Sequence, residues 1–243
     1  MADVNVARPA HRDVVAIERR VFLGMAIAIA VTVVLGFTLN AARMDWTFLE
    51  LPGQVHWHAA VFLAWIMLYV AQNWLIVRDA VRWHRRLGVL GAVLAAAMVV
   101  LGIVTTVMAI EQHRVPSFFP PGIFLVLDVL GVVGFGILTG WAIVLRRRAA
   151  WHKRLMLCGT ILVMSPALGR ILPMPLLGTF APTAVFAFMA MYVIAGMLLD
   201  VRLRGNVHPA YYWGGGVVAV TQALVGPLGV SPPVLRLVAH LAA

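Results

Sequence analysis

Long apolar runs, interrupted by short basic or proline-containing segments, dominate the pattern of this chain. Seven runs are long enough to cross a hydrocarbon core of about 30 Å, which takes roughly 20 residues of helix. They cover residues 21–39, 55–77, 87–110, 121–145, 155–172, 182–199 and 211–230. The last run contains Gly214, Gly215, Gly216 and Pro227, which lower its helix propensity, so six spans is the alternative. The pattern predicts an all-α integral membrane bundle of seven helices.

Composition agrees with a membrane protein. Of the 243 residues 63% are hydrophobic and 12% charged, which leaves too little polar surface for a water-soluble globule. We expect one transmembrane domain over 21–230, with an N-terminal segment at 1–20 and a C-terminal tail at 231–243. The first apolar run is long enough to span, which favours an anchor over a cleaved signal. The lone Cys158 forms no intrachain disulfide, and we expect it to pack in the bundle.

The basic residues predict the orientation. With the N-terminus in the cytoplasm, fifteen Lys and Arg residues fall on that side, three fall outside, and Arg170 lies within a span. The fifteen are Arg8, Arg12, Arg19, Arg20, Arg78, Arg82, Arg85, Arg86, Arg146, Arg147, Arg148, Lys153, Arg154, Arg202 and Arg204. This asymmetry predicts a multi-pass protein of a bacterial inner membrane with a cytoplasmic N-terminus. The net charge of +10 then serves topology and anionic lipid headgroups, and we expect no nucleic-acid partner.

A short motif occurs twice, each time where a basic loop meets an apolar run. Its copies are WHRRL at 83–87 and WHKRL at 151–155, and they predict a duplicated two-helix hairpin over about 55–110 and 121–175. About a pseudo-twofold axis, His84 and His152 would face one another at the cytoplasmic surface. Two facing imidazoles are axial ligands of a six-coordinate haem b. The alternative is that both extend the basic belt, with Trp83 and Trp151 as interface anchors.

Two charged residues lie inside the predicted spans. Asp128 is about 12 Å below the outer start of the fourth span, and Arg170 is about 8 Å from the outer surface. Charges in hydrocarbon are costly and normally pair within the bundle, so we expect a buried Asp128–Arg170 pair. Such a pair either fixes helix packing or handles protons, ions or substrate.

Further polar groups collect near the same outer level. His56 and His58 begin the second span, and Glu111 and His113 end the third. With Asp128 they form a candidate site for a transition metal, since imidazole and carboxylate groups suit zinc, iron or copper. Residues two apart on a helix point about 200° apart, so such a site needs an unwound first turn near Pro52-Gly53. Interfacial histidines without a ligand, or a proton relay, are the alternatives.

The histidine near the start of the second span, together with HRRLG at 84–88 and HKRLM at 152–156, resembles a widespread group of bacterial polytopic membrane proteins of unknown function. This likeness covers about residues 55–175 and implies a membrane scaffold without an assigned activity. Histidines near both surfaces also resemble the two-haem transmembrane b-type cytochromes of ascorbate-dependent ferric reductases. That likeness implies two separate sites, because His56 and His84 are about 42 Å apart along a helix.

Three functions follow from these residues. The first is a redox protein that binds haem or a metal through His84 and His152 or through the outer cluster. The second is a small proton-coupled transporter using Asp128 and Arg170. The third is a non-catalytic subunit or assembly factor, which would form a larger membrane complex or a homo-oligomer. No catalytic motif assigns a reaction, and a retinal pigment is excluded because the only lysine, Lys153, lies in a predicted loop.

Overall fold

A computed structural model describes residues 11–43, 50–116 and 119–243 of the chain, and within these ranges it contains helices and no strand. The fold is an all-α membrane bundle, and every predicted span coincides with a helix or a bent helix pair. The long helices are α1 (His11–Ala42), α2 (Gly53–Val77), α3 (Val81–Glu111), α4 (Pro121–Val144), α5 (Ala149–Leu162), α8 (Ala181–Arg204) and α9 (Pro209–Gly229). The short ones are α6 (Ser165–Ile171), α7 (Met174–Leu177), the 3-10 helix η2 (Gly178–Phe180) and α10 (Pro232–Leu241).

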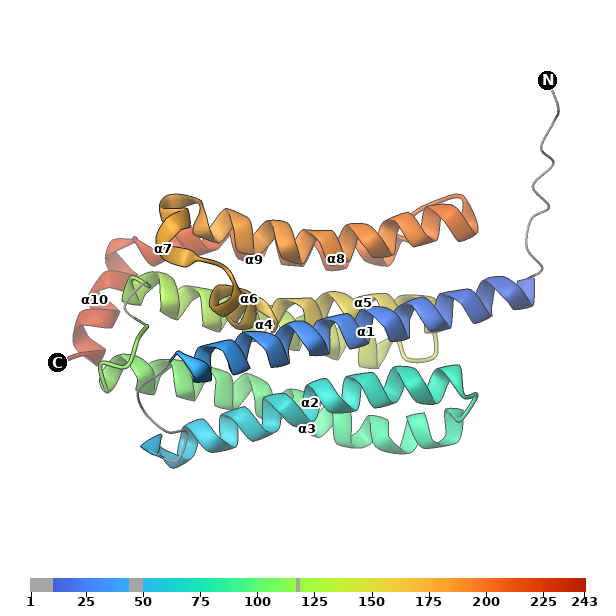
Figure 1. Ribbon diagram of the computed structural model, residues 1–243, viewed down its shortest axis with the longest axis horizontal. Helices are drawn as coiled ribbons and strands as arrows, with labels where there is room; N and C mark the ends of the chain where they lie inside the picture. Colours follow the sequence, from blue (N-terminus) through green and yellow to red (C-terminus); the bar gives the residue numbers. More distant parts are fainter. Residues whose placement is uncertain (1–10, 44–49, 117–118) are drawn as a thin grey trace, which may run out of the picture.

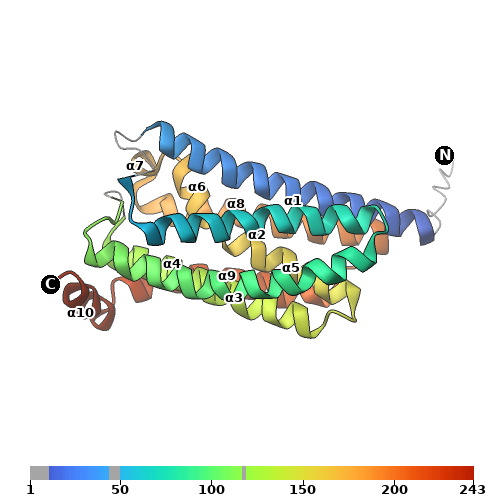
Figure 2. The ribbon, with the colours of Figure 1, turned by 90° about the horizontal axis from the view of Figure 1, so that it is seen from below.

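The long helices run side by side along one axis (Figure 1 and Figure 2). One end, at the right of Figure 1, carries the start of α1 and the connections at 78–80, 145–148 and 205–208; we call it the basic end. The opposite end carries the α3–α4 connection, α7 and α10. The start of α1 and the end of α10 lie at opposite ends of the bundle (Figure 1).

The helices have the length and composition of membrane spans. Five of them, α1, α2, α3, α4 and α8, are each long and apolar enough to cross a bilayer. Two bent pairs, α5 with α6 and α9 with α10, bring the number to as many as seven; their bends are 46° and 73°. The protein is therefore a multi-pass membrane protein.

The outer surface of the bundle is apolar. Large hydrophobic side chains are exposed along the helices, among them Val31, Val93, Val100, Val144, Met191 and Leu198. A water-soluble protein would not expose so continuous an apolar surface. On α2, the exposed Trp57 and Trp74 lie 17 residues apart, or about 26 Å of helix, close to the hydrocarbon thickness. They stand where interfacial tryptophans anchor a span.

The glycine-rich helix α4 lies inside the bundle. It packs against α3, α5 and α9. At Gly122 an added Cβ would lie 2.2 Å from the carbonyl oxygen of Gly229 in α9, so this contact of two backbones excludes any side chain. Without a hydrophobic force between helices in lipid, such close contacts supply the packing energy.

The ends of the elements differ from those predicted. Helix α1 starts at His11, well before the first apolar residue of its run, and α10 forms within the expected tail 231–243. Hydropathy identifies the residues within the hydrocarbon, whereas the hydrogen-bonded helix continues past the membrane surface. The predicted span 155–172 is broken between α5 and α6. Pro166 lacks the N–H that would continue the ladder through this point.

Candidate functional site

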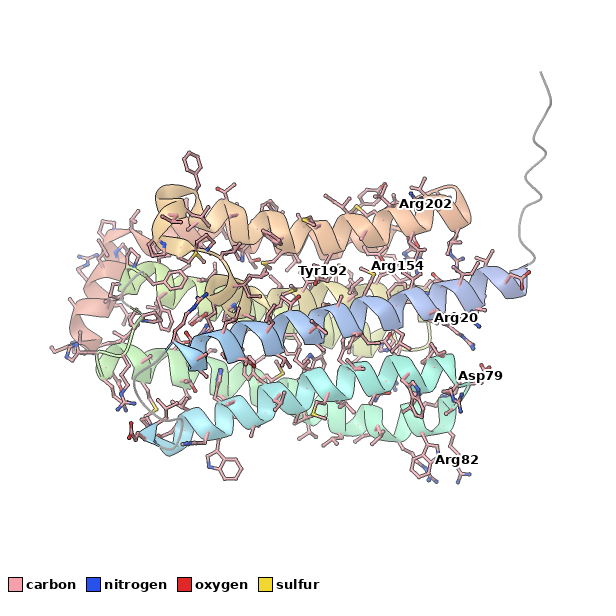
Figure 3. All side chains as sticks on the ribbon, in the orientation of Figure 1. Arg20, Asp79, Arg82, Arg154, Tyr192 and Arg202 are labelled. Carbon is pink, nitrogen blue, oxygen red and sulfur yellow. The ribbon has the colours of Figure 1, made fainter. Side chains whose placement is uncertain are left out.

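Five charged side chains meet between α1, α5 and α8 near the basic end. They are Glu18, Lys153, Arg154, Asp200 and Arg204, and we call them the ionic junction. Glu18, Arg154 and Asp200 are only 2%, 0% and 1% exposed, so this is a buried ionic cluster. Figure 3 shows Arg154 between α8 and α1, whereas Arg20, Asp79, Arg82 and Arg202 lie at the periphery of this end.

Arg154 is the centre of the junction. Its Nε donates to Asp200 Oδ2 at 2.9 Å, and its Nη2 pairs with Asp200 Oδ1 and donates to Glu18 Oε1 at 2.9 Å. Its Nη1 donates to the carbonyl oxygen of Ala150 at 2.9 Å. The guanidinium holds Asp200 through two nitrogens while Nη2 also reaches Glu18, a planar bidentate geometry that the ammonium of a lysine could not provide.

The two carboxylates have further partners. Glu18 Oε2 accepts from Lys153 Nζ at 2.6 Å and from Arg204 Nη2 at 2.8 Å. Asp200 Oδ2 also accepts from the backbone N–H of His208 at 3.0 Å. Each buried charge is therefore paired and hydrogen-bonded, as burial requires.

Aromatic rings line the junction. The guanidinium carbon of Arg154 lies 5.6 Å from the ring centre of Tyr211 and 6.0 Å from that of Phe22. His208 lies beside the junction at the start of α9, where its Nδ1 accepts from the Ala210 N–H at 3.1 Å. Burial lowers the pKa of His208 below its usual value, and the positive charge of Arg154 acts in the same direction.

Sequence reasoning missed this junction. It assigned Arg154 and Arg204 to headgroup contacts and placed Glu18 in a polar N-terminal segment. The available signal was that Glu18 and Asp200 are acids close to the basic ends of predicted spans, where the remaining charges are almost all positive. An isolated acid in such a belt is a candidate partner for a buried cation.

The second group of interest is the histidine pair of the repeated motif. The structure brings His84 of α3 and His152 of α5 together as the repeat predicts: their ring centres are 6.2 Å apart, with planes at 86°. Nδ1 of His152 lies 2.8 Å from the carbonyl oxygen of Ala142. A hydrogen on this Nδ1 leaves the lone pair of Nε2 available as a ligand.

His84 lacks a fixed partner for one ring nitrogen. Its Nδ1 is buried and makes no hydrogen bond of good geometry to the described part of the chain, although the backbone of Gln72 lies close enough to act on this imidazole. Gln72 Oε1 is another buried acceptor without a partner there. Buried polar atoms without partners are few in native proteins and call for an explanation such as an additional bound group.

The two imidazoles fit a pair of axial metal ligands. Metal–imidazole nitrogen distances of about 2.0–2.1 Å put the centres of two opposed rings on one metal about 6 Å apart. The described residues contain no group of three or more His, Cys, Asp or Glu side chains that could hold a metal ion. A two-histidine donor set therefore suits haem, which supplies four nitrogens of its own, better than a four-ligand zinc site.

The predicted outer metal cluster is not assembled. His56, His58, Glu111, His113 and Asp128 do not form a group that could hold a metal ion within the described residues. Glu111 and His113 are exposed. His58 stacks on Phe62, with ring centres 4.1 Å apart, and its buried Nδ1 has no hydrogen-bond partner in the same part of the chain. Helix α2 is regular from Gly53, so no unwound turn rotates His56 and His58 onto one face.

The expected Asp128–Arg170 ion pair is also absent among the ion pairs of the described residues. Arg170 instead donates from Nη1 to the carbonyl oxygen of Pro166 at 2.8 Å, and its guanidinium lies 4.6 Å from the ring centre of Phe37. The reason is the break before α6, which directs this short helix toward α1. Asp128 and Arg170 remain within range of a Coulomb interaction.

Comparison with known proteins gives no relative: no family model, no curated protein and no solved structure matches the chain.

Proposed function

We propose that this chain is a haem-binding redox protein of a bacterial inner membrane, with its N-terminus in the cytoplasm and His84 and His152 as the axial ligands. The observation that carries the proposal is the proximity of two imidazoles from two helical hairpins, with ring centres 6.2 Å apart and ring planes at 86°. The positive-inside asymmetry supports the orientation, which puts this pair at the cytoplasmic side.

The residues around the histidine pair would hold haem in different ways. The Ala142 carbonyl fixes the tautomer and orientation of His152 through Nδ1, as outer partners of metal-bound histidines do. The exposed Arg85 and Arg86 are free of ion pairs within the described chain and suit the carboxylates at the edge of a haem. Lys153 and Arg154 are already engaged by Glu18. When bound, haem supplies one-electron transfer.

The test is an absorption spectrum of the purified full chain in mild detergent, oxidised by air and then reduced with dithionite. We expect a Soret band that moves to the red on reduction and new α and β bands. His84→Ala and His152→Ala should each lose these bands while keeping the elution volume and far-ultraviolet circular dichroism of the wild type.

A matched control is His240→Gln, because His240 is exposed on α10 and should leave the spectrum unchanged. A wild-type protein that stays colourless after expression with excess haem precursor, and after addition of haemin, would overturn the proposal. Retention of the reduced spectrum by both alanine variants would overturn the assignment of ligands.

A specific observation also favours proton-coupled transport as a second candidate. His58, Asp128 and Arg170 come from three helices, and Arg170 lies within Coulomb range of the other two without forming an ion pair in the described chain. His58 Nδ1 and Arg170 Nε are buried and without hydrogen-bond partners there. Ionisable groups of this kind within spans commonly serve proton relays.

This alternative is tested in proteoliposomes with a trapped pH dye. Asp128→Asn should abolish proton uptake driven by an imposed potential, whereas Glu111→Gln, at an exposed position, should not. Wild-type vesicles whose uptake equals that of empty vesicles would remove this candidate and leave the haem proposal untouched.

A further inference from the structure

Helix α10 lies across the end of the bundle opposite the basic end (Figure 1 and Figure 2). Its axis is bent by 73° from that of α9, with the break between Gly229 and Pro232. It contacts α3, α4 and α9, yet none of its residues is fully buried. Helix α10 is therefore attached to the bundle along one side only.

The side chains of α10 divide by direction. At 100° per residue, Val234, Val238 and Leu241 share one side, and these three are half-buried. Arg236 and His240 lie on the other side and are exposed. Leu235 and Leu237 flank the helix between these sides and are 50% and 47% exposed. The flanks thus present apolar surface that the described part of the chain does not cover.

The side chains beneath α10 are loosely packed. A hollow of about 270 Å³ separates Val238 and Ala242 from the region of the α3–α4 connection, where Ile110, Val115 and Pro121 line it. Protein contacts therefore account for only part of the apolar surface of α10. The rest of this apolar surface must be covered by something other than the described chain.

The neighbouring lipid-facing surface of α9 indicates that lipid covers the apolar flanks of α10. Leu224 and Leu228 are exposed in the last turns of α9, and Val230 is exposed directly after it, so exposed apolar side chains continue up to the break before α10. The 21 residues of α9 span about 31 Å, so α9 alone has the length of the hydrocarbon core, although its hydropathy makes it a candidate span only together with α10. A helix that follows such a span at 73° runs close to the plane of the membrane surface.

We propose that α10 is an interfacial helix, lying in the lipid bilayer interface on the side opposite the basic end. Leu235 and Leu237 sit at the acyl boundary, and Arg236 and His240 reach the headgroups and water. A short helix with apolar flanks and a cationic polar side has the composition of helices that lie in this zone. The occupant of the uncovered surface is lipid, and α10 contributes no part of a transmembrane span.

The test uses site-directed spin labels on the full chain in phosphatidylcholine–phosphatidylglycerol vesicles. Leu237→Cys places a label on an apolar flank, and Arg236→Cys places the matched control one residue away on the polar side. The native Cys158 is fully buried, and wild type treated with the same spin label checks that it does not react. We expect the ratio of oxygen to nickel-chelate accessibility to be at least several-fold higher at position 237 than at 236.

Two results would overturn the proposal. Equal, high nickel-chelate accessibility at both positions would place α10 in water. Low accessibility to both reagents at position 237 would show that protein, such as a second copy of the chain, covers the flank. If either variant fails to elute as the wild type does, Leu235→Cys with His240→Cys makes the same comparison on the other flank.

Discussion

At the scale of single residues, the two copies of the repeated motif have opposite environments. Arg154 is fully buried between two carboxylates, whereas Arg86, at the same place in the first copy, is exposed. The difference comes from the neighbours: α5 packs beside α8 and Arg154 meets the carboxylates of α1 and α8, while the start of α3 is at the surface. The same motif position can therefore serve a buried structural role in one half and a surface role in the other.

Arg154→Met should destabilise the protein strongly. The substitution keeps much of the side-chain volume but leaves Glu18 and Asp200 without their shared cation, and removing one partner of a buried ionic cluster costs about 3–5 kcal/mol. Arg86→Met, the matched control, should change stability by less than about 0.5 kcal/mol. Unfolding in detergent, followed by tryptophan fluorescence, measures both. Equal stabilities for the two variants would show that the junction contributes nothing net.

His208 makes stability depend on pH. Because its pKa is lowered in the folded protein, the unfolded chain binds the proton more readily, and stability is lost as the pH falls from about 6.5 toward the lowered value. Protonation would also remove the Nδ1 acceptor of the Ala210 N–H. His208→Asn keeps a capping acceptor without titrating, so it should flatten this part of the curve of unfolding temperature against pH. An unchanged slope would assign the effect to other groups.

At the scale of elements, the five to seven candidate spans could be predicted and the ends of their helices could not. Hydropathy responds to the apolar middle of each helix, which is why α2 and α4 match their predicted ranges within two residues. The turns of α1 and α8 that carry Glu18 and Asp200 lie outside the apolar runs, so no run predicts that they are helical. The break before Ser165-Pro166 also could not be predicted, because Pro is tolerated within many membrane helices.

The contact between α8 and α9 depends on Gly196. An added Cβ there would lie 2.2 Å from the hydroxyl oxygen and 2.6 Å from Cζ of Tyr211, a buried ring that also faces Arg154. Gly196→Ala should therefore push α9 away and loosen the ionic junction, lowering the unfolding temperature by several degrees. Gly140→Ala, where no atom lies within 4 Å, is the control and should be neutral. A neutral Gly196→Ala would mean that Tyr211 moves without cost.

At the scale of the whole molecule, the repeat predicted more of the site than isolated polar residues did. A duplicated hairpin would place equivalent residues near one another, and the rings of His84 and His152 do lie close together. The depth of a residue along its helix, by contrast, gives only one of the three coordinates that decide whether two side chains meet. Asp128 and Arg170 have similar depths, but the bend at α6 sends Arg170 to Phe37 and its own backbone. The ionic junction needed the packing of α1, α5 and α8, which no local pattern contains.

The positions of the termini lead to a prediction about the complete topology. The start of α1 and the end of α10 lie at opposite ends of the bundle (Figure 1), so the described chain between them makes an odd number of crossings. If seven spans cross the membrane and the N-terminus is cytoplasmic, as we propose, the chain after α10 is outside. Fusion of alkaline phosphatase to the C-terminus should therefore give high activity in cells, whereas a fluorescent protein that matures only in the cytoplasm should stay dark there. Fusions after residue 205, in the α8–α9 connection, should give the reverse result and serve as the control. A fluorescent C-terminal fusion would mean either that α9 does not cross or that the whole bundle is inverted, and the fusion at 205 distinguishes these two outcomes.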